Sequence, residues 1–243
     1  MVFKSGLLSQ DLSNIGNKSR IIVALDFHPP GRDPLEWWIH VLEEISDIIA
    51  GVKIGLPALL KTGLKGISKL VQRFEDEVYF LADFKLADIP AVVLEEIEQL
   101  SALGFKGSII HLFPMGYEPV VDKARKLEHQ IFGVVYMSHR GCKLFNELFQ
   151  TLLEYALTLH VDGVIVGATE QDKIRSVRAK LGKKMLILSP GVGAQGASPG
   201  SALRAGADFE IVGRAITMSR KPRQAAISIT RAQVMKYECG GRA

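Results

Sequence analysis

Eight short apolar runs recur along the chain, separated by longer stretches in which apolar and polar residues follow helical spacing. Each run is rich in valine, isoleucine or leucine, and most lack the period-two alternation of a strand with one wet face. Strands that are covered on both faces have this composition. The expected strands are Ile21–Leu25, Gly51–Ile54, Val78–Ala82, Gly107–Ile110, Ile131–Tyr136, Gly163–Val166, Met185–Leu188 and Phe209–Val212.

The stretches between the runs predict helices, and several have clear end signals. Asp33, followed by a proline, indicates the cap and first turn of a helix that continues through Leu35–Ala50. A second helix is expected over Pro90–Leu103, and Ser198 with the next proline opens a shorter one. Further helices are expected near residues 57–75, 117–129, 143–160, 170–181 and 222–237.

This alternation predicts an α/β fold with parallel strands joined by right-handed crossovers. Eight strand–helix units favour a closed barrel over an open sheet, and 243 residues suit one barrel of that kind. No linker or change of composition indicates a second domain. We therefore expect a single (β/α)8 barrel domain over residues 1–243, with an N-terminal helix near Leu7–Ile15 capping its bottom.

Composition narrows the classes of partner. The hydrophobic content of 47% and the charged content of 23% are those of a folded globular protein. The net charge of +4 comes from scattered basic residues, so a nucleic-acid surface is not favoured. Basic residues are concentrated at one place in the chain, beginning at Arg214. We interpret the later ones as the solvated start of a helix: Arg220, Lys221 and Arg223.

The cysteines and the N-terminus indicate a cytoplasmic protein. Cys142 and Cys239 cannot form a disulfide framework and lack the spacing of a metal site. The first residues turn polar at once and offer no signal-peptide core. No apolar run approaches the roughly 18 residues needed to cross a bilayer. We expect reduced thiols and no membrane partner.

Polar residues interrupt the apolar pattern almost entirely at the carboxyl ends of the expected strands, where barrel enzymes assemble their active sites. These residues are Asp26, Lys53, Asp83, Lys85, His111, Ser138, His139, Ser189 and Arg214. The strands were assigned from apolar content alone, so this placement is independent support for the fold.

Five charged residues are expected to share one pocket at this edge. Asp83 and Lys85 are two apart and project to the same side of a strand, and Lys53 and Asp26 on adjacent strands can reach them. Asp88 follows shortly after. A lone carboxylate at a strand end is usually solvated or caps a helix, but burying a whole unpaired set would be costly. The set therefore indicates a catalytic centre.

A second constellation predicts a phosphate site. A glycine-rich loop, Ser189–Gly196, follows the seventh strand, and Gly213 and Arg214 follow the eighth. The loops after these two strands are the usual phosphate site of this fold, and a guanidinium suits bidentate phosphate contact. A glycine-rich loop alone is more often a plain turn, so the pairing with Arg214 carries the prediction.

At these positions the sequence resembles the orotidine 5′-phosphate decarboxylase family, in its shorter microbial type. The segment Ala82–Pro90 matches the family signature Asp-x-Lys-x-x-Asp-Ile. Val52–Gly55, Met137–His139, Ser189–Gly196 and Ile211–Arg214 match the other family motifs in order and spacing. The resemblance extends over nearly the whole barrel, from Asp26 to Arg214.

The resemblance implies a role for each matching residue. The catalytic residues would be Lys85, Asp83, Asp88 and Lys53. Lys85 would stabilise and then protonate a carbanion at C6, with Asp83 beside the substrate carboxylate and Asp88 reaching across a homodimer interface. The substrate-binding residues would be Asp26, Lys53, Ile89, Ser138, Pro190, Gly191, Gln195, Gly213 and Arg214. Within that set, the resemblance implies that Asp26 and Lys53 would hold the ribose, Ser138 and Pro190 would contact the pyrimidine, and Gln195 and Arg214 would clamp the phosphate.

The implied reaction is decarboxylation of orotidine 5′-phosphate to uridine 5′-phosphate, with no metal and no cofactor. Three positions depart from the family pattern: Val92 replaces a substrate-contacting threonine, Ala197 a common glycine and Arg140 a common proline. Val92 cannot donate a hydrogen bond, so one ribose or base contact is lost or replaced. None of the three belongs to the charged set.

Other functions remain open as alternatives. The related Mg2+-dependent hexulose-phosphate synthases and keto-gulonate-phosphate decarboxylases share the barrel, but they place a glutamate where this chain has Lys53, whose charge would repel the metal. A non-catalytic phosphate-binding barrel would not need Lys85 between two carboxylates. His111 and His139 are interpreted as structural residues more readily than as proton carriers.

Overall fold

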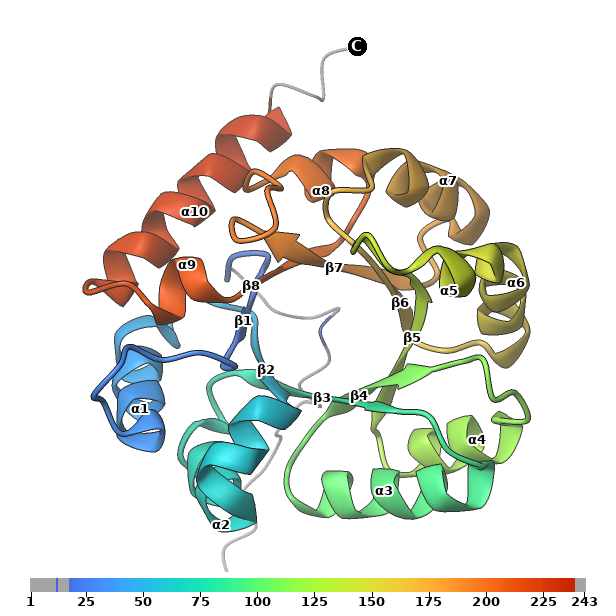
Figure 1. Ribbon diagram of the computed structural model, residues 1–243, viewed down its shortest axis with the longest axis horizontal. Helices are drawn as coiled ribbons and strands as arrows, with labels where there is room; N and C mark the ends of the chain where they lie inside the picture. Colours follow the sequence, from blue (N-terminus) through green and yellow to red (C-terminus); the bar gives the residue numbers. More distant parts are fainter. Residues whose placement is uncertain (1–11, 13–17, 239–243) are drawn as a thin grey trace, which may run out of the picture.

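The computed structural model describes residue 12 and residues 18–238 of the chain. Eight parallel strands form a closed barrel in sequence order, so each strand pairs with its neighbours in the chain and β8 pairs with β1 (Figure 1). The strands are β1 (Ile21–Ala24), β2 (Gly51–Gly55), β3 (Tyr79–Leu86), β4 (Gly107–His111), β5 (Gln130–Tyr136), β6 (Gly163–Val166), β7 (Leu186–Val192) and β8 (Phe209–Val212).

Helices form a ring around the barrel and cover its outer face (Figure 1). They are α1 (Pro34–Ile45), α2 (Leu56–Phe74), α3 (Pro90–Ala102), α4 (Glu118–Lys126), α5 (Lys143–Glu147), α6 (Phe149–Leu159), α7 (Gln171–Leu181), α8 (Ser201–Ala205), α9 (Arg214–Thr217) and α10 (Pro222–Glu238). Among the described residues, no helix combines the length and the apolar character needed to span a membrane.

The predicted (β/α)8 barrel is confirmed, and most strand boundaries agree within one residue. Two strands run further than expected: β3 continues to Leu86 and β7 to Val192. Both extensions carry the polar residues of the candidate site, which give no apolar signal. The helix expected over residues 143–160 is divided into α5 and α6, and the short α9 had no predicted counterpart.

The apolar core has two layers, one inside the barrel and one between the barrel and the helices. The inner layer contains inward-facing residues of the strands, such as Phe132, Phe209 and Leu188. Leu12 is fully buried and packs with this layer. The rest of the expected N-terminal helix lies outside the described residues, as does Cys239, while Cys142 is a free thiol.

A buried carboxylate joins the last helices to the barrel. Glu210 on β8 has no exposed surface and accepts hydrogen bonds from the backbone N–H groups of Gly200 (2.8 Å) and Ala202 (3.1 Å). The side-chain amide of Gln233 on α10 donates a third, at 3.0 Å. Because a buried polar group needs such partners, these hydrogen bonds to Glu210 hold the start of α8 and the middle of α10 in place. The start of α8 directly follows the loop after β7, which is one of the two predicted phosphate loops.

Candidate active site

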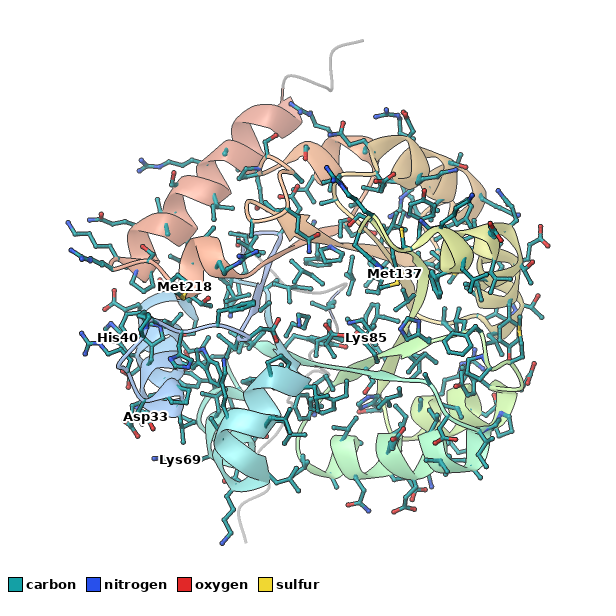
Figure 2. All side chains as sticks on the ribbon, viewed as in Figure 1. Asp33, His40, Lys69, Lys85, Met137 and Met218 are labelled. Atoms are coloured by element: carbon teal, nitrogen blue, oxygen red, sulfur yellow. The ribbon has the colours of Figure 1, made fainter. Side chains whose placement is uncertain are left out.

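Four charged side chains from three adjacent strands form a continuous network at the carboxyl end of the barrel. The Lys53 ammonium on β2 lies 3.1 Å from Oδ2 of Asp26, just after β1, and 2.8 Å from Oδ2 of Asp83 on β3. The other oxygen of Asp83 accepts a hydrogen bond from Nζ of Lys85. Lys85 lies near the centre of the ring of strands in Figure 2. The predicted pairing of these four residues is therefore present.

The network is largely buried, and its charges stabilise one another. Burial opposes the charge of Lys53, but the carboxylates of Asp83 and Asp26 outweigh it and raise the pKa of this ammonium above its usual value. Burial likewise opposes ionisation of Asp83, but Lys53 and Lys85 outweigh it and lower the pKa of this carboxyl. Both shifts favour the charged forms of Lys53 and Asp83, so this buried pair stabilises itself as an ion pair. One oxygen of Asp26, Oδ1, is buried and has no hydrogen-bond partner among the described residues.

Lys85 occupies an irregular part of β3 rather than a regular strand. Ala82 pairs with Ser108 and Leu86 with Ile110. Between these two pairs β3 therefore contains two more residues than β4. Within this bulge Lys85 has a φ of 54°, in the left-handed region that side chains other than glycine seldom adopt. Asp83 and Lys85 do contact each other, as expected. The direction of the Lys85 side chain, however, is set by the bulge and not by the regular alternation of a strand.

Asp88 is not part of this network within one chain. Its side chain is exposed, and Oδ1 accepts a hydrogen bond from the backbone N–H of Ile89 at 2.6 Å. Tyr117, which is fully buried, donates its hydroxyl to the backbone carbonyl of Asp88 at 2.8 Å. Ile89 is 62% exposed. The loop is thus held by its backbone while its side chains face outward.

A cavity of about 210 Å3 opens beside Asp83 and Lys85. Ser138, Pro190 and Gln195, which the resemblance assigned to substrate binding, are among its lining residues. Its apolar walls were not predicted, and they come from Ile109, Val134, Ile165 and Ile211 on four different strands. Tyr136, Met137, His139 and Gly167 complete the lining. The apolar residues could have been anticipated only from the inward register of each strand. A planar ring with a few polar substituents suits such a space.

The loop after β7 reaches over the cavity and depends on glycine. Gly191 has a φ of +107°, and a Cβ atom there would lie 2.5 Å from Oε1 of Gln195. Gln195 is exposed, and Oγ of Ser138 lies 3.5 Å from its Oε1. Ala197 pairs with Val192 and accepts a backbone hydrogen bond from Gly193 at 2.8 Å, so its methyl group does not prevent the turn.

The end of β5 is held by a side chain that the sequence did not single out. The Oδ1 atom of Asn146 accepts from the backbone N–H of Met137 at 3.0 Å, and its Nδ2 donates to the Met137 carbonyl at 2.9 Å. This amide replaces a strand partner for the residue just before Ser138. Gly167 leaves room for the Ser138 side chain, because a Cβ atom at position 167 would lie only 2.6 Å from Cβ of Ser138.

Arg214 and Gly213 lie at the start of α9, next to the cavity but not among its lining residues. Gly213 is the cap residue of this short helix. The Arg214 guanidinium is exposed and packs on the ring of Phe27, 5.3 Å from its centroid. The arginine is therefore oriented by an aromatic ring from the β1–α1 loop.

The two histidines near the site have different surroundings. His111 packs against Phe113 and Phe145, and its Nδ1 atom is buried without a partner among the described residues. Burial lowers its pKa, and the charge of Lys85 lowers it further. His139 is exposed and lines the cavity. Across the described ranges no group of three or more histidine, cysteine or acidic side chains is arranged to hold a metal ion.

The fold and the charged centre define a (β/α)8 barrel with its active site at the carboxyl ends of the strands. Residues 19–229 match the profile of the orotidine 5′-phosphate decarboxylase / HUMPS family. The chain therefore belongs to this family.

Named relatives share most of its length. The orotidine 5′-phosphate decarboxylase of Pyrococcus furiosus is 36% identical over 210 residues, which cover 86% of this chain and 95% of the relative. The crystal structure of the Sulfolobus solfataricus enzyme of that name has a TM-score of 0.79 and 31% identity, covering 90% of this chain and all of the other. The enzyme of the same name from Methanocaldococcus jannaschii, complexed with the inhibitor BMP, has a TM-score of 0.76 at 27% identity and covers 88% and 98%.

Proposed function

We propose that this chain decarboxylates orotidine 5′-phosphate to uridine 5′-phosphate. The observation that carries the proposal is the network of Asp26, Lys53, Asp83 and Lys85 beside a cavity suited to a pyrimidine ring. The family also contains HUMPS enzymes, and Lys53 separates the two chemistries. An ammonium between two carboxylates occupies the position that a magnesium ligand would need.

The chemistry requires stabilisation of a localised carbanion. The bond between C6 and the carboxylate breaks, CO2 departs, and the electron pair stays on C6. Lys85 provides a positive charge for that pair and then transfers a proton from Nζ to C6. Because Asp83 accepts a hydrogen bond from Lys85, the ammonium is oriented before the substrate arrives. Asp83 would lie beside the substrate carboxylate, and Lys53 keeps Asp83 ionised.

The remaining assigned residues would bind parts of the substrate that do not react. Asp26 and Lys53 would hold the ribose, and the unpaired Oδ1 of Asp26 is available for a hydroxyl group. Ser138 with the backbone of Pro190 would contact the pyrimidine. Gln195, Arg214 and the backbone of Gly191 and Gly213 would hold the phosphate. Closure of the Gln195 loop over that phosphate would use binding energy remote from C6 to assist the reaction.

We further propose that the working unit is a homodimer in which Asp88 serves the partner's site. The side chain of Asp88 has no cationic partner within the described part of its own chain, and it faces outward. Exposed apolar residues follow it on the same segment: Ile89 is 62% exposed and Val92 40%. Burial of apolar surface of this kind is a common driving force for association. Val92 would then contribute to the interface instead of binding substrate.

We also retain three broader expectations: one barrel domain over residues 1–243, a cytoplasmic location, and turnover that needs neither metal nor cofactor. A spectrophotometric assay with orotidine 5′-phosphate, run with and without EDTA, tests the activity. Equal turnover in both conditions is expected. Activity lost with EDTA, or no activity at all, would contradict the proposal.

Two variants test the assigned roles. Lys85→Ala should abolish turnover while the unfolding transition stays close to that of the parent protein; near-normal turnover would remove Lys85 from its role. Mixing inactive Asp88→Ala and Lys85→Ala proteins should restore part of the activity, because one site of a mixed dimer then has both residues. If subunits exchange and no activity returns, Asp88 does not act across the interface.

A further inference from the structure

Lys61 is a cation beside Asp26 of the charged network, and the proposed reaction does not use it. It lies on α2, and its ammonium donates a hydrogen bond to the backbone carbonyl of Asp26 at 2.9 Å. It also lies 5.9 Å from the ring centroids of both Phe27 and Trp38. These contacts hold the ammonium at the carboxyl end of β1. The same turn carries Asp26, which belongs to the charged network.

The ring of Phe27 brings Lys61 and Arg214 to one place. The Arg214 guanidinium lies 5.3 Å from the centroid of this ring, and the Lys61 ammonium lies 5.9 Å from it. The backbone of Phe27 is held in place, because the indole N–H of Trp38, a fully buried residue, donates to its carbonyl at 3.1 Å. In Figure 1, β1 lies between β8, which leads into α9, and β2, which leads into α2.

Neither cation is neutralised by the protein. Within the described residues, no carboxylate lies within 4.0 Å of Lys61 or of Arg214, although many other surface cations of the chain have such a partner. Two uncompensated cations on one ring create a local positive potential, which attracts anions. Aromatic rings stabilise cations without neutralising them, so this arrangement keeps both charges available to a ligand.

We propose that Lys61 is a second cation of the phosphate subsite, acting with Arg214 on the dianion of the substrate. The inference rests on the proposed function, since it assumes that Arg214 binds the phosphate. Lys61 contributes through its charge, and Phe27 positions both cations. The substrate class is unchanged, but the phosphate is recognised from the β1–α1 side as well as from the loops after β7 and β8.

The test compares ligands with and without the phosphate group. Inhibition constants for uridine 5′-phosphate and for uridine are measured against decarboxylation, at low and at high ionic strength. Lys61→Met keeps the apolar stem on the rings and removes the charge. Lys65→Met, on the same helix, is the matched control, because Lys65 is exposed, has no ion pair among the described residues and changes the net charge equally.

We expect Lys61→Met to weaken binding of uridine 5′-phosphate by about three- to tenfold at low ionic strength, with a smaller effect at high salt. Uridine binding should change little, Lys65→Met should resemble the parent protein, and Lys61→Arg should recover most of the affinity. Equal losses for uridine and its phosphate would show that Lys61 only supports the loop, and would overturn the proposal.

Arg214→Met separates failure of this inference from failure of the proposed function. If Arg214→Met weakens phosphate binding while Lys61→Met matches Lys65→Met, the phosphate site stands and Lys61 has no part in it. If Arg214→Met leaves phosphate binding unchanged, the phosphate site itself is misplaced, and the inference about Lys61 fails with it.

Discussion

His129, at the start of β5, makes the stability of the barrel depend on pH. It is 3% exposed, with Nε2 2.8 Å from Oγ of Ser108 and Nδ1 3.1 Å from the carbonyl of Phe105. A carbonyl can only accept, so Nδ1 carries the proton and Nε2 accepts from the serine. The neutral ring therefore has both nitrogens paired, and protonation of Nε2 would place a positive charge in this buried site and force the Ser108 hydroxyl to accept instead of donate.

The pKa shift of His129 determines how much unfolding free energy is lost as the pH falls. The pKa of His129 is lowered from 6.5 to about 4, mainly by burial; the carbonyl of Phe105 partly opposes this shift, and the charge of Lys106 adds to it. Between these pH values the unfolded chain binds the proton more tightly, so stability falls as pH decreases through this window. The loss is about 2 kcal/mol by pH 5 and about 3 kcal/mol by pH 4, at roughly 1.36 kcal/mol per pKa unit.

The assay is chemical unfolding at pH 7 and pH 5, with the free energy of unfolding compared between the parent protein and His129→Gln. Glutamine cannot titrate, so the variant should lose about 2 kcal/mol less than the parent on going to pH 5. His40→Gln, at an exposed histidine of α1, is the control and should behave like the parent. Identical pH dependence in the parent and in His129→Gln would refute the reasoning.

Three further substitutions test the site. Lys53→Met leaves Asp26 and Asp83 without their shared partner, so it should lower the free energy of unfolding by about 3–5 kcal/mol and greatly reduce kcat. A variant with unchanged stability and unchanged kcat would contradict the network. Gly167→Ala should push Ser138 aside, costing about 1–3 kcal/mol and raising KM more than it lowers kcat, which steady-state kinetics would show. Tyr117→Phe should cost about 1 kcal/mol and lower kcat through the Asp88 loop; unchanged kcat with reduced stability would limit Tyr117 to packing.

Much of the fold was readable from the sequence because strands buried on both faces have a strong apolar signal. The runs at Ile21–Leu25 and Phe209–Val212, for example, lie within one residue of β1 and β8. The charged network was also predictable, since strand order alone brings Asp26, Lys53 and Asp83 to one edge. These features depend on topology, which the pattern determines.

The features that escaped prediction depend on local backbone geometry or on contacts distant in the sequence. The bulge around Lys85 has no apolar signature, so the same-side reasoning reached the correct pairing by an incomplete route. The division at Leu148 between α5 and α6 lacks a glycine or proline. The bond between Asn146 and Met137 and the ring of Phe27 under Arg214 appear only once the chain is folded.

The left-handed backbone at Lys85 sets the stability of the chain against the catalytic role proposed for this residue. A side chain in this conformation costs about 1–2 kcal/mol relative to glycine, which adopts it freely. In the proposed mechanism the enzyme must retain a lysine at position 85 in spite of this cost, whereas a chain under no catalytic demand could place glycine there. Selection for thermal stability alone would therefore act against the lysine to which the proposal assigns the proton transfer.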